Sequence, residues 1–113
     1  MKGTVGLSEA SFEPEIRQVE GPVGVDFYAP WCGPCRMLAP LLEQLAGESA
    51  GTVKFAKLNL DAAPERAAPY GDTGVPTLML YRGGEPIDRM VGLASPRSLR
   101  TWPANAAAEA ATA

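Results

Sequence analysis

The 113-residue chain contains no histidine. Imidazole is the usual general base beside a serine or cysteine nucleophile and a common zinc ligand, so its absence excludes histidine-based acid–base catalysis, hydrolase triads and imidazole metal sites. Cysteine is scarce as well, with only two residues. Two thiolates supply half of a tetrahedral zinc site, and only carboxylates could complete it. We therefore expect no metal site.

The chain also lacks an excess of positive charge and a long apolar run. Its formal net charge is -3, with 20% charged residues, which does not suit a basic nucleic-acid interface or a polybasic membrane surface. No stretch is apolar enough to span a membrane, and residues 1–7 lack the core of a signal peptide. We expect a cytoplasmic protein with no nucleic-acid or membrane partner.

Hydrophobic residues make up 46% of the chain, which at this length favours one compact domain with its own core. We expect that domain to span residues 1–103. Pro103 should interrupt the last helix early, because proline cannot donate the helical hydrogen bond. Residues 104–113 are mostly alanine, and a short helix without tertiary packing is marginal in water. We expect this tail to fray.

Apolar runs alternate with turn residues along the chain. Strands are predicted at residues 23–29, 52–60, 75–81 and 86–91, and helices after Ser8, from the first cysteine to about residue 46, after Asp61 and after Ser95. The first two strands, joined by a helix, should be parallel. Gly83 and Gly84 supply the positive φ values of a tight hairpin, so the last two strands should be antiparallel.

Both cysteines lie in one C-x-x-C motif, Trp31-Cys32-Gly33-Pro34-Cys35, between a strand-like and a helix-like segment. Two sulfurs at the first turn of a helix can close into a disulfide and reopen with little chain movement. The free N–H groups and the dipole of the helix favour a thiolate on the first cysteine. The motif predicts dithiol–disulfide exchange; a structural disulfide or an inert buried pair is the alternative.

With this motif placed between a strand that holds Asp26 and a helix broken by Pro40, the chain resembles the thioredoxin family. The resemblance covers roughly residues 5 to 102 and includes Phe27, Ala29, Ala39-Pro40, Lys57 to Asp61, Pro64, Tyr70-Gly71, Gly74 to Thr77, Gly84 and Gly92. It implies an α/β thioredoxin fold: three layers, with a central five-stranded mixed sheet flanked by four helices. It also implies a protein-disulfide reductase, regenerated by an NADPH-dependent thioredoxin reductase, with no cofactor beyond the redox-active cysteine pair.

The resemblance also implies roles for individual residues. Cys32, exposed at the helix N-terminus, would attack a substrate disulfide, and Cys35 would resolve the mixed disulfide. Gly33-Pro34 is the family pattern of reductants. Asp26 would be a buried carboxyl whose pKa is raised by desolvation and which accepts the Cys35 proton through water, while Lys57 would tune it. A tolerated buried ion pair is the alternative for Asp26 and Lys57.

A docking surface for extended substrates is implied beside the sulfurs. Pro76 should face them in a cis peptide, and Val75 should offer backbone groups. Trp31, Gly74 and Gly92 would border this surface. Trp31 as a mere packing residue, and the glycines as turn residues, are the alternatives.

The chain departs from the family pattern in a few positions. Tyr28 replaces a usual tryptophan, and the polar Asp72 near the docking rim points to a different choice of partners. Two other functions stay open: a binding or scaffold module in which thiol chemistry is incidental, and an oxidase or isomerase. Gly33-Pro34 argues against the latter. An acidic domain of this size is expected to be a monomer.

Overall fold

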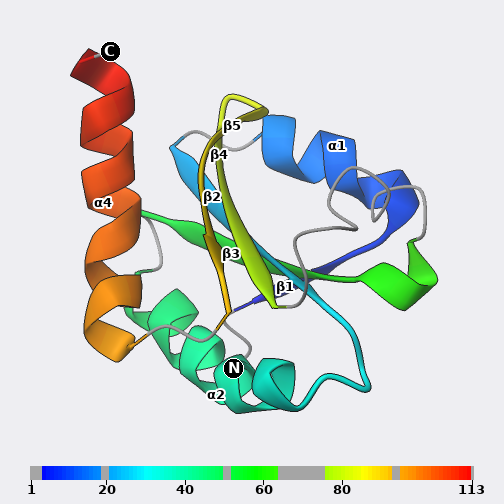
Figure 1. Cartoon of the computed structure of the whole chain (residues 1–113). Helices are drawn as coiled ribbons and strands as arrows, with labels where there is room; N and C mark the ends of the chain where they lie inside the picture. Colours follow the sequence, from blue (N-terminus) through cyan, green and yellow to red (C-terminus); the bar gives the residue numbers. More distant parts are fainter. Residues whose placement is uncertain (1–3, 19–20, 50–51, 64–75, 93–94, 113) are drawn as a thin grey trace.

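The structure is a computed structural model that describes residues 4–18, 21–49, 52–63, 76–92 and 95–112, with side chains described up to residue 104 (Figure 1). Its elements in chain order are β1 (Val5–Leu7), α1 (Glu9–Arg17), β2 (Pro22–Tyr28), α2 (Gly33–Glu48), β3 (Lys54–Asn59), the 3-10 turn η1 (Leu60–Ala62), β4 (Thr77–Arg82), β5 (Glu85–Val91) and α4 (Pro96–Thr112).

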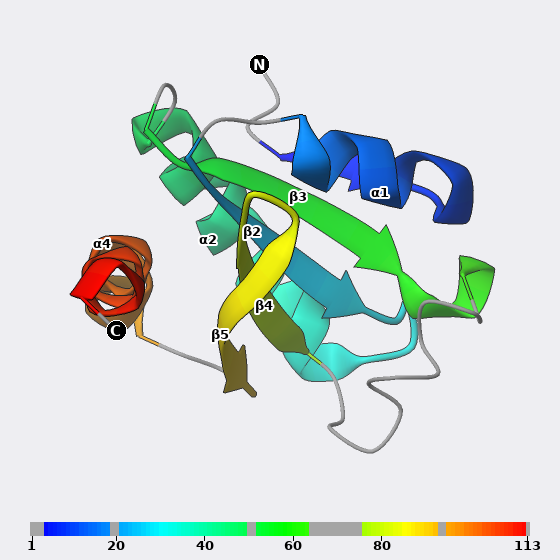
Figure 2. The same cartoon turned by 90° about the horizontal axis from the view of Figure 1, so that it is seen from above.

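The five strands form one mixed sheet in the order β1-β3-β2-β4-β5. β3 pairs in parallel with β1 and with β2, whereas β4 is antiparallel to both β2 and β5. Seen from above, α1 lies on one side of the sheet and α2 and α4 on the other (Figure 2). The three-layer thioredoxin fold with a five-stranded mixed sheet, expected from the resemblance, is confirmed.

Each face of the sheet has its own apolar core. The α1 side is built on Phe12 and Ile16, and the β2 side chains that point to it are Val23, Val25 and Phe27. The opposite core gathers Leu38, Leu42, Leu45, Phe55, Leu78, Leu80, Leu99 and Trp102 from α2, the sheet and α4. Side chains alternate between the faces of a strand, so Asp26 points toward α2.

Local sequence explains where the elements begin and turn. Ser8 caps α1 in a reciprocal capping box with Ser11, whose backbone N–H donates to the Ser8 side chain at 3.1 Å. The hairpin between β4 and β5 turns through Gly83 and Gly84 at φ values of 61° and 85°, as predicted.

α4 is held by polar contacts as well as by its core residues. The Trp102 indole donates to an Asp88 carboxylate oxygen of β5 at 2.8 Å. The Arg100 guanidinium donates to Glu48 at the end of α2 at 3.1 Å. These contacts tie the last helix to the sheet and to α2.

Two expectations about helices need correction. Four flanking helices were expected, and three α-helices lie in the described part of the chain; the expected helix with Pro64 near its start falls outside it. Pro103 does not interrupt α4, which continues to Thr112. Proline removes one backbone bond but leaves the next turns intact, and the following alanines have the highest helix propensity. The domain division at residue 103 stays a prediction.

The sequence patterns also missed β1, whose three residues are too short to show alternation. Within the described ranges, no helix combines the length and the apolar character that crossing a membrane requires.

Candidate active site

The two cysteines form a disulfide at the start of α2, with their Cα atoms 5.2 Å apart. Cys32 is the N-cap of the helix in an extended conformation, and the backbone N–H of Cys35 donates to the Cys32 sulfur at 3.2 Å. Pro34 lies in the first turn, where its missing N–H is not needed. A helix-terminal N–H aimed at one sulfur stabilises negative charge on that sulfur. The arrangement therefore favours Cys32 as the thiolate.

The expectation that Cys32 is exposed is wrong for this disulfide form. Cys32 is only 4% exposed and Cys35 3%, because both pack with Ala29 and with the partly buried Tyr28. Burial therefore does not distinguish the two sulfurs. Their positions in the helix do, since Cys32 caps it and Cys35 lies inside the first turn.

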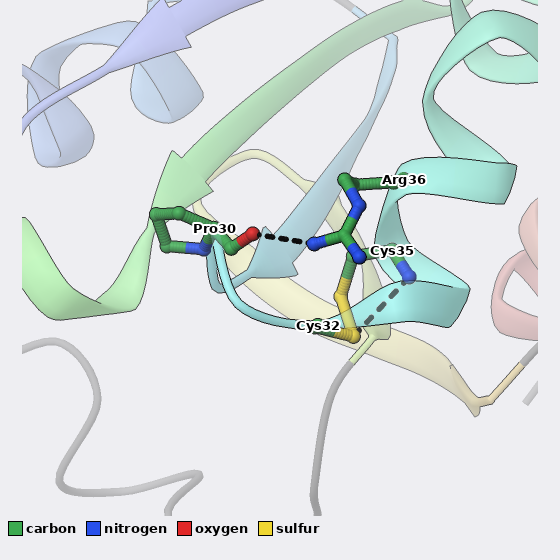
Figure 3. The surroundings of a disulfide bond; sticks show 4 residues. All are labelled: Pro30, Cys32, Cys35 and Arg36. Atoms are coloured by element: carbon green, nitrogen blue, oxygen red, sulfur yellow. Dashed lines mark hydrogen bonds between the residues drawn. A yellow bond between two sulfur atoms is a disulfide. The ribbon is translucent and has the colours of Figure 1, made fainter.

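Arg36 links the helix to the loop before the motif. Figure 3 shows its guanidinium reaching back from α2, where one nitrogen donates to the Pro30 carbonyl oxygen at 2.9 Å. The backbone N–H of Arg36 also donates to the Cys32 carbonyl at 3.2 Å. These two bonds hold the loop and the first helical turn together, and they therefore fix the backbone on both sides of Cys32.

Asp26 lies in the middle of β2, 4% exposed, and its Oδ1 has no hydrogen-bond partner among the described residues. Burial disfavours the charged carboxylate and raises the pKa of Asp26 to about 7; the nearby Lys57 ammonium has a smaller, opposite effect. The register of the parallel pair sets Lys57 of β3 beside Asp26. The structure thus brings together the carboxyl and the lysine named from the sequence.

A small pocket opens at this carboxyl. It is lined by Thr4, Asp26, Ala39, Leu42, Glu43 and Lys57. Ala39 stands four residues after Cys35, so both share one face of α2 one turn apart. The pocket has room for about one water molecule. Such a water molecule would lie beside the Asp26 carboxyl.

Two of the predicted docking residues, Pro76 and Gly92, lie at the same end of the sheet as the motif. Phe27, Thr77 and Val91 pair in one row across β2, β4 and β5. The next residues along this edge are Pro76 and Gly92, joined by a bond from the Gly92 N–H to the Pro76 carbonyl at 2.8 Å.

Large apolar side chains are exposed in the motif, in α2 and at the end of β5. Trp31 is 68% exposed, Met37 69% and Val91 53%. Trp31 therefore does not serve mainly as a packing residue, and its placement suits contact with another protein. Gly74 and Val75, as well as Asp72, lie outside the described residues.

Comparison with known proteins agrees with this geometry. The thioredoxin family model matches residues 3–104. The chain is 47% identical to a thioredoxin of Synechocystis over 92 residues, covering 81% of this chain and 86% of that protein. It is also 47% identical to a thioredoxin of Allochromatium vinosum over 98 residues, covering 87% and 92%. The chain belongs to the thioredoxin family.

Membership in the thioredoxin family, together with the Cys32–Cys35 pair at disulfide distance, makes the protein a thiol–disulfide oxidoreductase. Disulfide-containing proteins are the substrates that this family implies. Among the described residues, no cluster of three or more histidine, cysteine or acidic side chains could hold a metal ion.

Three residues of the site were not found by reading the sequence. Arg36 follows the motif directly, where its contact with a loop carbonyl has no local signature. Glu43 follows Ala39 by one helical turn, so helical spacing alone could have placed it on the face that looks toward Asp26. Thr4 contacts Glu43 from 39 positions away, which no sequence pattern reveals.

Proposed function

We propose that the protein is a general protein-disulfide reductase and dithiol electron carrier of the cytoplasm. The observation that carries the proposal is the disulfide at the N-terminus of α2. The Cys32 sulfur accepts a helix N–H, and the buried Asp26 carboxyl lines a pocket together with Ala39, one helical turn after Cys35. Reduction of this disulfide yields the dithiol that reacts with substrates.

In the forward reaction, the Cys32 thiolate attacks one sulfur of a substrate disulfide. A Cys32–substrate bond forms, the substrate S–S bond breaks, and the first substrate thiolate leaves. Cys35 then loses its proton, through a water molecule in the pocket, to the Asp26 carboxylate and attacks the Cys32 sulfur. The second substrate thiolate leaves, so the substrate gains two electrons and the Cys32–Cys35 disulfide forms.

Lys57, Gly33 and Pro34 complete this proposed centre. Lys57 tunes the Asp26 carboxyl through its positive charge, and Gly33-Pro34 keeps the short helical turn rigid and biases the pair toward reduction of others. Substrates bind at the edge formed by Trp31 and Gly92 together with Gly74, Val75 and Pro76.

Turnover requires an external source of electrons. We infer that an NADPH-dependent flavoprotein thioredoxin reductase returns the disulfide to the dithiol, and that the protein acts as a monomer without a bound cofactor. The close similarity to thioredoxins over most of the chain supports this assignment.

The decisive assay is reduction of insulin disulfides with dithiothreitol as electron donor, followed by NADPH oxidation with a thioredoxin reductase. We expect activity in both, none in Cys32→Ser, and a trapped mixed disulfide with substrate in Cys35→Ser. Absence of insulin reduction by the folded wild-type protein would reject the proposal. A redox potential close to that of disulfide-forming enzymes would instead identify the protein as an oxidase or isomerase.

A binding module is the second candidate, and the exposed Trp31, Met37 and Val91 favour it. Replacing both cysteines with serine leaves this apolar surface in place. Retention of the biological activity in that variant would support binding, whereas its loss would support redox chemistry.

A further inference from the structure

A chain of contacts leads from the N-terminal edge of the fold to the buried carboxyl. The Thr4 backbone N–H donates to one Glu43 carboxylate oxygen at 3.1 Å, and the Thr4 hydroxyl donates to the other. That second oxygen lies 3.8 Å from the Lys57 ammonium. Thr4 is only 7% exposed, so it holds Glu43 from a nearly buried position.

The depth of the groups places the Lys57–Glu43 pair at the mouth of the pocket and Asp26 at its base. The Lys57 and Glu43 side chains are 42% and 36% exposed, whereas Asp26 is 4% exposed and sits beside Lys57 in the strand register. The Lys57 ammonium therefore has two carboxyl groups near it, Glu43 at the mouth of the pocket and Asp26 at its base.

We propose that Thr4 and Glu43 are positioning residues that hold the Lys57 ammonium at the mouth of the pocket and so keep it from pairing closely with the Asp26 carboxyl. The inference rests on the proposed role of Asp26 as proton acceptor. A close ion pair at Asp26 would make the carboxylate a weaker base for the Cys35 proton.

Few charged residues line the pocket at Asp26, so the effect of Glu43 on this carboxyl can be isolated. Besides Asp26 itself, Lys57 from β3 and Glu43 from α2 are the charged residues that line the described pocket. On the other neighbouring strand, β4, the residue paired with Asp26 is the apolar Leu78. Removing the Glu43 charge thus leaves Asp26 as the nearest carboxyl in the pocket for the ammonium.

The test is a carbon-13 NMR titration of the Asp26 carboxyl in wild-type protein and in Glu43→Gln. We expect the Asp26 pKa to fall by at least roughly half a unit in the variant, about a threefold rise in its acid dissociation constant. The inflection in the pH profile of model-disulfide reduction should move down by the same amount.

Glu48→Gln is the matched control, because it removes an equal charge from the same helix but contacts Arg100, outside the pocket. It should leave the Asp26 titration unchanged. Thr4→Val, which removes only the hydroxyl donor, should lower the Asp26 pKa less than Glu43→Gln does, and Thr4→Ser should restore the wild-type value. The threonine variants also decide the question if Glu43→Gln does not fold.

An unchanged or raised Asp26 pKa in Glu43→Gln, or an equal fall in Glu48→Gln, would overturn the inference. If Thr4→Ser and Thr4→Val titrate alike, Thr4 has no positioning role. The titration needs no substrate, so its result stands apart from the insulin assay, whose failure would reject the proposed function instead.

Discussion

Asp26 combines two properties that are costly in a stable core. It is almost completely buried, and one carboxyl oxygen has no hydrogen-bond partner within the described ranges. A buried polar atom without a partner destabilises a fold by about 1–3 kcal/mol. A structural ion pair with Lys57 does not explain it, because the Lys57 ammonium pairs with Glu43, at 3.8 Å. A carboxyl that titrates near neutral pH inside a pocket fits proton transfer better.

Replacing Asp26 with asparagine tests that role in the chemistry. The shape is kept but no proton can be accepted, so we expect release of substrate from the mixed disulfide to slow by roughly ten- to a hundredfold at pH 8. The rate should also lose its inflection near pH 7, the Asp26 pKa. Stopped-flow measurement with a fluorescent peptide disulfide across pH 5.5 to 9 checks both effects.

Lys57→Met is the companion variant for this measurement. The ammonium lowers the Asp26 pKa, so its removal should move the inflection to higher pH while leaving it visible. An Asp26→Asn profile identical to that of the wild-type protein would show that water, and not Asp26, takes the Cys35 proton.

Among the elements, β2 depends on one glycine to make room for a ring from the neighbouring strand β3. A Cβ atom added to Gly24 would lie 2.9 Å from Cε1 and 3.0 Å from Cδ1 of the Phe55 ring. Phe55 is 2% exposed and belongs to the core under α2. Its ring therefore occupies the space that a side chain at position 24 would need.

We expect Gly24→Ala to lower the free energy of unfolding by about 1–3 kcal/mol, because the ring must shift inside a packed core. Gly47→Ala is the matched control: nothing lies within 4 Å of its added Cβ in α2, so it should stabilise by about 0.5–1 kcal/mol. Urea unfolding measures both. A double-mutant cycle with Phe55→Leu should show favourable coupling, and additivity would contradict the clash.

A helix, strand or turn can be predicted from the sequence when the residues that determine it are close together in the chain. The hairpin through Gly83 and Gly84 was predicted because both glycines are needed for its backbone angles. β1 was missed because three residues carry no pattern, and its place is fixed by pairing with β3. The continuation of α4 past Pro103 does not follow from the proline alone, because the helix propensity of the alanines after it outweighs the local effect of proline.

At the scale of the whole molecule, the site assembles from segments far apart in the sequence. The disulfide was predictable because both sulfurs lie within four residues. Asp26 beside Lys57 followed from the family resemblance, since parallel strands bring them together. The Thr4–Glu43 contact spans 39 positions, and neither residue type signals it, so only the folded chain reveals it.

Asp26 should also govern how the stability of the whole protein depends on pH. Its pKa rises from 3.8 to about 7 on folding, so the folded state binds the proton more tightly than the unfolded chain does. The contribution of Asp26 to the free energy of unfolding is fully present below pH 4. It falls as the pH rises from 4 to 7 and stays low above pH 7. The fall amounts to about 4 kcal/mol, since one pKa unit corresponds to about 1.36 kcal/mol.

Asp26→Asn removes this titration, so the variant should gain stability relative to the wild-type protein as the pH rises. The difference between the two free energies of unfolding should be on the order of 4 kcal/mol larger at pH 8 than at pH 4. Guanidinium unfolding of the oxidised proteins at a series of pH values provides the measurement. A difference that is constant across this range would show that Asp26 titrates alike in the folded and unfolded chains, and the buried-base account of the site would then fail.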